Sequence, residues 1–150
     1  MRRLALVLAG ILIAGIAHAA DGPPGPPPQH HAPSGPQSIW HNGSLMTLYP
    51  NLPDGSFEIR YTQPRPALYG YVVPGTLLVK AWWDHGAAFG TAFVFALGCP
   101  PFPFEVSGAI QGDALVMHGY PPVPNEWCEV MWYDPPVGNG VLVFTHGAPQ

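Results

Sequence analysis

The feature that most constrains the fold is a succession of short apolar-rich segments, separated by turn residues, that runs from residue 38 to residue 150. The stretch FEIRYT (57–62) is typical: Phe57, Ile59 and Tyr61 alternate with polar residues, which predicts a strand with one buried face. No segment combines helical periodicity with helix caps. The pattern predicts eight strands at 44–50, 57–62, 76–84, 89–97, 104–110, 114–120, 127–133 and 140–146.

Turn residues indicate how these strands connect. Asn42-Gly43 and Asp54-Gly55 are favoured tight-turn pairs, and similar short turns separate most of the other segments. The first six segments are therefore expected to form three successive hairpins, and the last two to close the chain across residues 134–140. We expect an all-β fold, a small antiparallel barrel or a sandwich, built as one domain over 38–150.

The amino terminus carries the features of an export signal. Arg2 and Arg3 precede an apolar run from Leu4 to Ile16, and Ala17-His18-Ala19 is an A-x-A cleavage site. This predicts a signal peptide over 1–19, because the apolar run is shorter than the roughly 20 residues of a membrane span. No membrane span is expected after its removal. Residues 20–37 are rich in proline and glycine, which predicts a disordered tail.

Charge excludes several classes of partner. After signal removal Arg60, Arg65 and Lys80 face nine acidic residues, which gives 3 − 9 = −6 with neutral histidines. Nucleic acid and anionic lipid require clusters of Lys and Arg, so neither is an expected partner. The charged fraction of 9% is far below the usual level of about a quarter.

The chain has two cysteines, Cys99 and Cys128. An exported protein folds where thiols oxidise, which favours one intrachain disulfide between them. The alternative is a redox or metal pair. Their spacing is far wider than C-x-x-C, and no further C-x-x-C or H-x(3–5)-H motif completes a zinc site. The structural bridge is therefore the preferred interpretation.

Several motifs occur in a recognisable order. They are WHNGS (40–44), EIRYTQPRPAL (58–68), PGTLLVKAWWD (74–84) and GTAFVFALGCPPFPFEVSG (90–108), followed by Cys128. In this order the chain resembles a group of small exported proteins of Gram-negative bacteria that have no assigned activity. The resemblance implies a secreted single domain with one disulfide, and it transfers no functional residue.

The polar residues give little support for catalysis. No serine lies in G-x-S-x-G, and the acidic residues fit solvent-facing positions of strands, so no catalytic residue is assigned. Histidines and methionines suit copper or zinc, but they form no repeated ligand motif. We therefore assign no cofactor and no metal ligand, and keep a copper- or zinc-binding protein of the periplasm as the alternative function. His30-His31 is the one adjacent histidine pair.

Aromatic residues are the main excess, and the pair Trp82-Trp83 is the most informative. Neighbouring residues of a strand point to opposite faces. Trp83 continues an apolar face with Val79 and Ala81, so it is expected in the core. Trp82 shares the other face with Lys80 and Leu78, and this stripe is the predicted binding surface.

Together these features predict a non-catalytic binding or interaction module of the periplasm or the exterior. Its partner would be a small molecule or another envelope protein. The sequence does not identify that ligand or partner.

Overall fold

A computed structural model describes residues 35–147, which form ten strands and two short 3-10 helices. The strands are β1 (Gln37–His41), β2 (Ser44–Tyr49), β3 (Ser56–Gln63), β4 (Leu77–Asp84), β5 (Ala87–Val94), β6 (Phe102–Gln111), β7 (Ala114–Gly119), β8 (Pro122–Pro124), β9 (Val130–Tyr133) and β10 (Val141–Thr145). The helices are η1 (Pro66–Leu68) and η2 (Gly138–Gly140). None of the helices in this part of the chain is long and apolar enough to cross a membrane.

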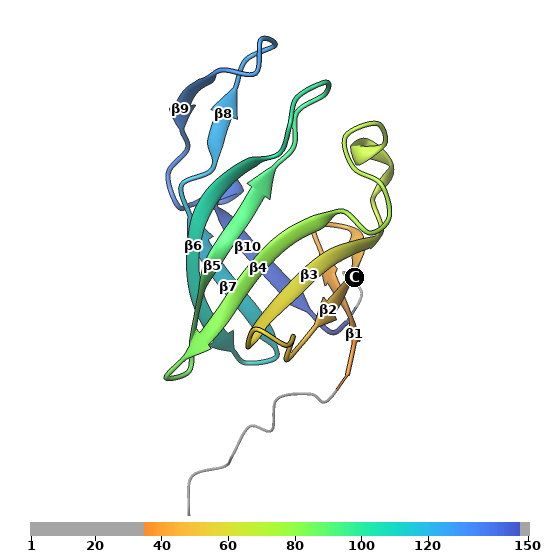
Figure 1. The fold of residues 1–150 in the computed structure, drawn as a ribbon, viewed down its shortest axis with the longest axis vertical. Coiled ribbons are helices and arrows are strands. Elements are labelled where there is room, and N and C mark those ends of the chain that lie inside the picture. The colour runs from red at the N-terminus through yellow and green to blue at the C-terminus, as the bar shows by residue number, and fades with distance from the viewer. Residues whose placement is uncertain (1–34, 148–150) are drawn as a thin grey trace, which may run out of the picture. The chain divides into compact units, whose positions relative to one another are not determined.

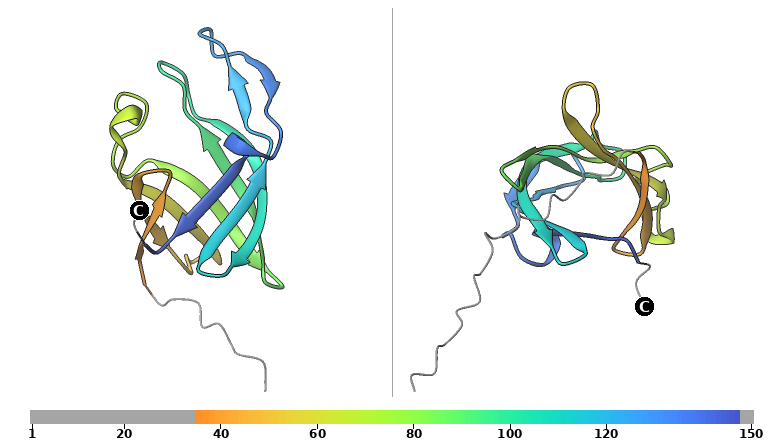
Figure 2. Two further views of the ribbon diagram at one scale, coloured as in Figure 1. Left: turned by 180° about the vertical axis from the view of Figure 1, so that it is seen from behind. Right: turned by 90° about the horizontal axis from the view of Figure 1, so that it is seen from below.

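Eight of these strands close into an antiparallel barrel in the order β1-β10-β7-β6-β5-β4-β3-β2 (Figure 1). The view from below shows the ring of strands (Figure 2). The predicted all-β class is thus confirmed, and the architecture is the barrel rather than the sandwich. Each barrel strand pairs on both sides, so closure leaves no free strand edge.

The predicted set of eight strands needs two corrections. The segment 127–133 contains β9, which pairs with β8 outside the barrel instead of with the last strand. The eighth barrel strand is β1, which was not predicted; it ends at His41, directly before the Asn42-Gly43 turn, and pairs with β2. Because β1 starts at Gln37, the domain begins one residue inside the predicted tail. The predicted signal peptide and most of that tail lie outside the described residues.

The barrel interior is filled by alternate residues of its strands. In β3 the buried residues Phe57, Ile59 and Tyr61 face inward, as their spacing predicts. Met46 and Met117 are fully buried and join them in one hydrophobic cluster. Burial raises the pKa of the Tyr61 phenol to about 12, because the charged form would be poorly solvated there.

The β1–β10 seam closes the barrel between segments distant in sequence. Across this seam Trp40 is the Cα partner of Thr145. Beside it, His41 Nδ1 donates a hydrogen bond to the Val143 carbonyl at 3.0 Å, and its ring lies 4.9 Å from that of Phe144. Burial lowers the pKa of His41, so the neutral imidazole is the form that this seam accommodates.

Acidification should therefore destabilise the barrel through His41. The unfolded chain takes up this proton near the ordinary histidine pKa of about 6.5, whereas the native state takes it up only at lower pH. The contribution of neutral His41 to the free energy of unfolding is fully present above about pH 6.5, and it is lost as the pH falls through the lower pKa of the native state. Urea unfolding at pH 7.5, 6 and 5 should show a steeper decline for the wild type than for His41→Gln. His85 is exposed, so His85→Gln is the control, and its stability should fall with pH as that of the wild type does. A fall in the stability of His41→Gln as steep as that of the wild type would contradict the role assigned to His41.

Outside the barrel, β8 and β9 form a two-stranded arm, residues 122–133, which projects beyond one end (Figure 1). All four residues of β9 are exposed, as is Trp127 near the tip. Asn125 Oδ1 shapes this tip by accepting hydrogen bonds from the backbone amides of Trp127 and Glu129, both at 2.9 Å. The arm is a separate extension rather than part of the barrel wall.

A disulfide between Cys99 and Cys128 fastens the arm to the β5–β6 loop. The two Cα atoms are 5.5 Å apart, within the usual range for a bridge, and none of the described residues is a free cysteine. The predicted bridge is thus confirmed. It indicates that the protein folds in an oxidising compartment outside the cytoplasm.

Candidate functional site

A groove of about 780 Å³ lies over the outer face of β4–β7. We call it the outer groove. It is lined by Trp82, Phe89, Gly90, Thr91, Glu105, Val106, Ser107, His118, Gly119, Tyr120 and Pro136.

Strand register explains why these residues meet. Trp82 is the Cα partner of Phe89, Phe89 of Ser107, and Ser107 of His118, so the four form one row across four strands. A second row two residues along carries Lys80, opposite Thr91, and then Glu105. Both rows point outward because the residues between them are inward-facing.

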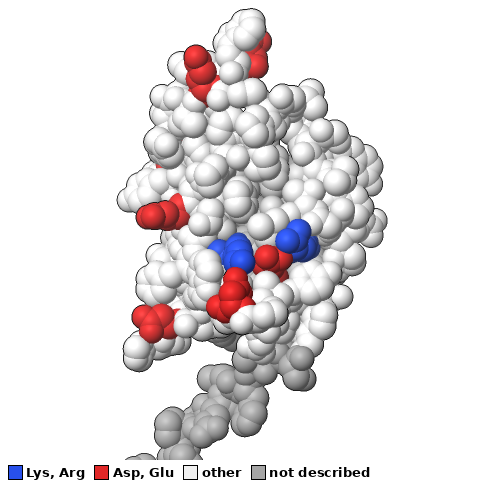
Figure 3. All heavy atoms as spheres, viewed as in Figure 1, with Lys and Arg blue, Asp and Glu red and all other residues white. Residues whose placement is uncertain are grey.

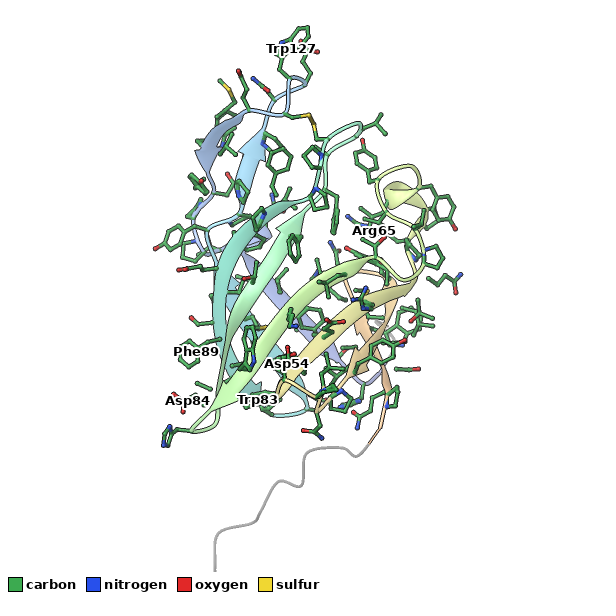
Figure 4. The ribbon with its side chains drawn as sticks, in the orientation of Figure 1. Asp54, Arg65, Trp83, Asp84, Phe89 and Trp127 are labelled. Carbon is green, nitrogen blue, oxygen red and sulfur yellow. A yellow bond between two sulfur atoms is a disulfide. The ribbon has the colours of Figure 1, made fainter. Side chains whose placement is uncertain are left out.

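Three aromatic side chains remain accessible in the outer groove. Trp82 is 44% exposed, Phe89 50% and Tyr120 61%. Phe89 projects outward from the barrel wall (Figure 4). Large apolar side chains that share one hollow while still exposed are a feature of binding surfaces.

Polar groups lie between the aromatic ones. The side chains of Thr91, Glu105 and Ser107 make no hydrogen bond or ion pair among the described residues, so their polar atoms are available to a ligand. His118 Nδ1 donates to the Pro136 carbonyl at 3.4 Å. This contact ties the wall of the groove to the segment that follows the arm.

Two glycines allow the strands beneath the groove to approach closely. A Cβ atom on Gly90 would lie 2.2 Å from the Lys80 carbonyl oxygen, and one on Gly119 would lie 2.4 Å from that of Glu105. Backbone atoms cannot move aside as a flexible side chain can, so neither position accepts a larger residue without a shift of the strands. The shape of the wall under the groove therefore depends on these glycines.

Lys80 and Trp82 lie together, as predicted for two residues on one strand face. Lys80 Nζ is 5.8 Å from the Trp82 ring centroid and donates to Asp54 Oδ2 at 2.7 Å. Hydrogen bonds from Lys80 and Ser56 hold the pKa of the Asp54 carboxyl well below its usual value, and the bond to Asp54 raises the pKa of Lys80. Lys80 thus remains charged and is engaged by Asp54.

Leu78 does not extend this surface. It is only 4% exposed and belongs to the hydrophobic cluster of buried residues. The β3–β4 register shifts at this point: Ile59 pairs with Val79 and Arg60 with Leu77, so Leu78 has no Cα partner on β3. A bulge of this kind breaks the alternation that was predicted for Leu78 and Lys80. Two of the three predicted binding residues, Trp82 and Lys80, are accessible, and their binding role stays a prediction.

Trp83 is less buried than expected. It is 43% exposed, nearly the same as Trp82. Its ring stacks on Phe57, with centroids 5.2 Å apart and planes inclined by 27°, and it lines a second cavity of about 150 Å³. Trp83 stands one residue before the end of β4, so its ring lies at the end of the packed interior instead of within it (Figure 4).

The two tryptophans should differ in their effect on stability despite equal exposure. Trp83→Ala should lower the free energy of unfolding by about 2 kcal/mol, roughly half the cost of truncating a fully buried tryptophan. Trp82→Ala should cost about 1 kcal/mol or less, because its ring covers no buried aromatic partner. Urea unfolding followed by far-ultraviolet circular dichroism measures both. Equal losses would show that the Phe57 stack adds nothing.

The histidines do not assemble into a metal centre in the described part of the chain, where no three His, Cys, Asp or Glu side chains could hold an ion together. His41 and His118 contact backbone carbonyls, and His85 pairs with Asp84. The metal alternative is left with His30 and His31, which lie outside the described residues.

Several residues of the groove were not predicted as a site. Phe89 was visible in the sequence as part of an alternating Phe and small-residue strand, and Glu105 only as an isolated acid. His118 and Tyr120 reach the groove because β7 pairs with β6, and no local signal in the sequence brings them to Trp82.

No known protein family, no curated protein and no solved structure matches this chain. The candidate site is therefore defined by its geometry alone.

Proposed function

We propose that this protein is a non-catalytic binding module exported to the periplasm or the exterior, and that the outer groove holds its ligand. The ligand would be a small molecule or a segment of an envelope component. The observation that carries this proposal is the joint exposure of Trp82, Phe89 and Tyr120 in one hollow. Exposed aromatic side chains contribute large contact areas at low entropic cost, which suits them to binding.

Three further features support a binding role. The groove lies on a closed barrel wall, so its side chains are held by strands paired on both sides. The polar side chains of the groove that make no hydrogen bond within the protein can orient a ligand, while the aromatic side chains supply contact area. The export signal in the sequence and the disulfide agree with a location outside the cytoplasm.

A panel of three probes tests the proposal: cellohexaose, a proline-rich hexapeptide and phosphatidylcholine vesicles. At least one should shift the backbone amide resonances of β4–β7 in ¹⁵N spectra, and Trp82→Ala should reduce that shift at the same probe concentration because it removes the largest ring of the groove. Lack of any Trp82-dependent shift would contradict the assigned groove. The probe should be recovered chemically unchanged, and a cleaved probe would contradict the non-catalytic role.

A further inference from the structure

We propose that the ligand of the outer groove is a neutral polysaccharide chain. This inference rests on the proposed function and specifies the chemical class that the groove recognises. It follows from the charges around the groove, the free polar groups within it and the pairing of the strands beneath it.

The charges argue against an anionic ligand. Of the three cations in the described part of the chain, Arg60 bonds to Glu58, Lys80 to Asp54, and Arg65 to Asn42. On the face shown in Figure 3 the blue cations each adjoin a red acid, and the remaining red side chains have no blue neighbour. Glu105 thus brings an uncompensated negative charge into the groove, which would repel phosphate, sulfate or carboxylate groups.

Strand pairing argues against an extended peptide. A peptide that binds to a sheet usually adds a strand to a free edge, where its amides and carbonyls find partners. Each of β4, β5, β6 and β7 is paired on both sides within the barrel, so the groove offers no such edge. The few polar side chains of the groove would leave most peptide groups of a bound chain without partners.

The groove composition matches the two surfaces of a sugar ring. Pyranose rings present apolar C–H faces, which stack on aromatic side chains, and equatorial hydroxyls, which need hydrogen-bonding partners at the rim. Trp82, Phe89 and Tyr120 supply the aromatic faces. Glu105, Thr91 and Ser107 supply acceptors and donors that are unused within the protein, and a carboxylate is the strongest acceptor for hydroxyl groups.

The length of the row indicates a chain rather than one sugar. The row from Trp82 through Phe89 and Ser107 to His118 spans three strand spacings, about 14 Å in all. Aromatic residues stand at both sides of the groove, with Tyr120 directly after β7. A chain of several sugar rings would contact all of them at once.

Isothermal titration of the full mature protein with cellohexaose, chitohexaose and maltohexaose tests this inference. At least one should bind, and Trp82→Ala should weaken binding about tenfold by removing a stacking surface. Tyr120→Ala should also weaken it, which keeps the test valid if Trp82→Ala folds poorly. Trp127→Ala removes an equally large exposed ring on the arm and is the matched control, with affinity expected to stay within about twofold.

The salt dependence of the affinity and the effect of Glu105→Ala distinguish a neutral sugar chain from other ligands. Affinity should be nearly independent of sodium chloride, because no ion pair forms, and Glu105→Ala should weaken binding about tenfold through lost hydroxyl contacts. Failure of all three sugars, or loss of binding in Trp127→Ala but not in Trp82→Ala, would overturn the inference. Binding of the hexapeptide in a Trp82-dependent manner would also overturn it, while leaving the groove as a binding site and the proposed function intact.

Discussion

Phe57→Ala should lower the free energy of unfolding by about 3–5 kcal/mol, the largest effect expected from a single substitution in this barrel. Phe57 is 1% exposed and is the largest of the fully buried side chains among the described residues. Truncation removes the apolar contacts of its ring and leaves a cavity that the surrounding strands cannot fill, because their pairing fixes their spacing. It also removes the surface on which Trp83 stacks.

Urea unfolding followed by circular dichroism measures this change, with Phe89→Ala as the control. Phe89 is 50% exposed on the outer wall, so its loss should cost about 1 kcal/mol or less. If Phe57→Ala does not fold, Phe57→Leu should fold with a loss of about 1–2 kcal/mol. Similar losses in Phe57→Ala and Phe89→Ala would contradict an interior position for Phe57.

Removal of the disulfide should produce the second large effect. The double variant Cys99→Ser and Cys128→Ser should lose about 2–4 kcal/mol, because the unfolded chain is no longer constrained across 29 residues. The double substitution avoids a free thiol that would form dimers. Wild type kept reduced in dithiothreitol should unfold at the same urea concentration as the double variant.

Removal of the disulfide should loosen one part of the protein more than the rest. Hydrogen exchange should accelerate most in the arm, since the bridge is what fastens its tip to the β5–β6 loop, while exchange in β3 and β4 should accelerate only by the amount that the fall in global stability sets. An unchanged unfolding midpoint would show that the arm holds its place without the bridge. Exchange in β3 and β4 that accelerates as much as exchange in the arm would show instead that the bridge supports the barrel as a whole.

Features encoded locally were predictable from the sequence. The hairpins β2–β3, β4–β5 and β6–β7 each follow from alternation on both sides of a short turn. Such pairings need only neighbouring segments, so their signals lie within one window of sequence. The Cys99–Cys128 bridge was predictable for another reason, since two cysteines outside the cytoplasm have one possible partner each.

Features that depend on distant pairing were not predictable. Strand β1 pairs along its five residues with β2 across the Asn42-Gly43 turn, but closing the barrel also requires its contact with β10 at the other end of the domain. The segment with β9 is apolar and alternating, yet it leaves the barrel, because an apolar pattern does not show whether a partner face exists. The same limit applies to the approach of Tyr120 to Trp82, and the inward position of Leu78 follows from a register shift between β3 and β4 that no local pattern announces.

The path of the disulfide has a consequence for resistance to proteases. Cys99 and Cys128 enclose β6, β7 and β8, and the exposed tip around Trp127 lies on the inner side of this closed loop. A single cut anywhere between the two cysteines, including one after Trp127, leaves both fragments in one covalent molecule. The carboxyl-terminal fragment would still carry β10, held beside the β7 and β1 strands that it pairs with. The exposed tip around Trp127 can thus be cut without release of the strand that closes the barrel.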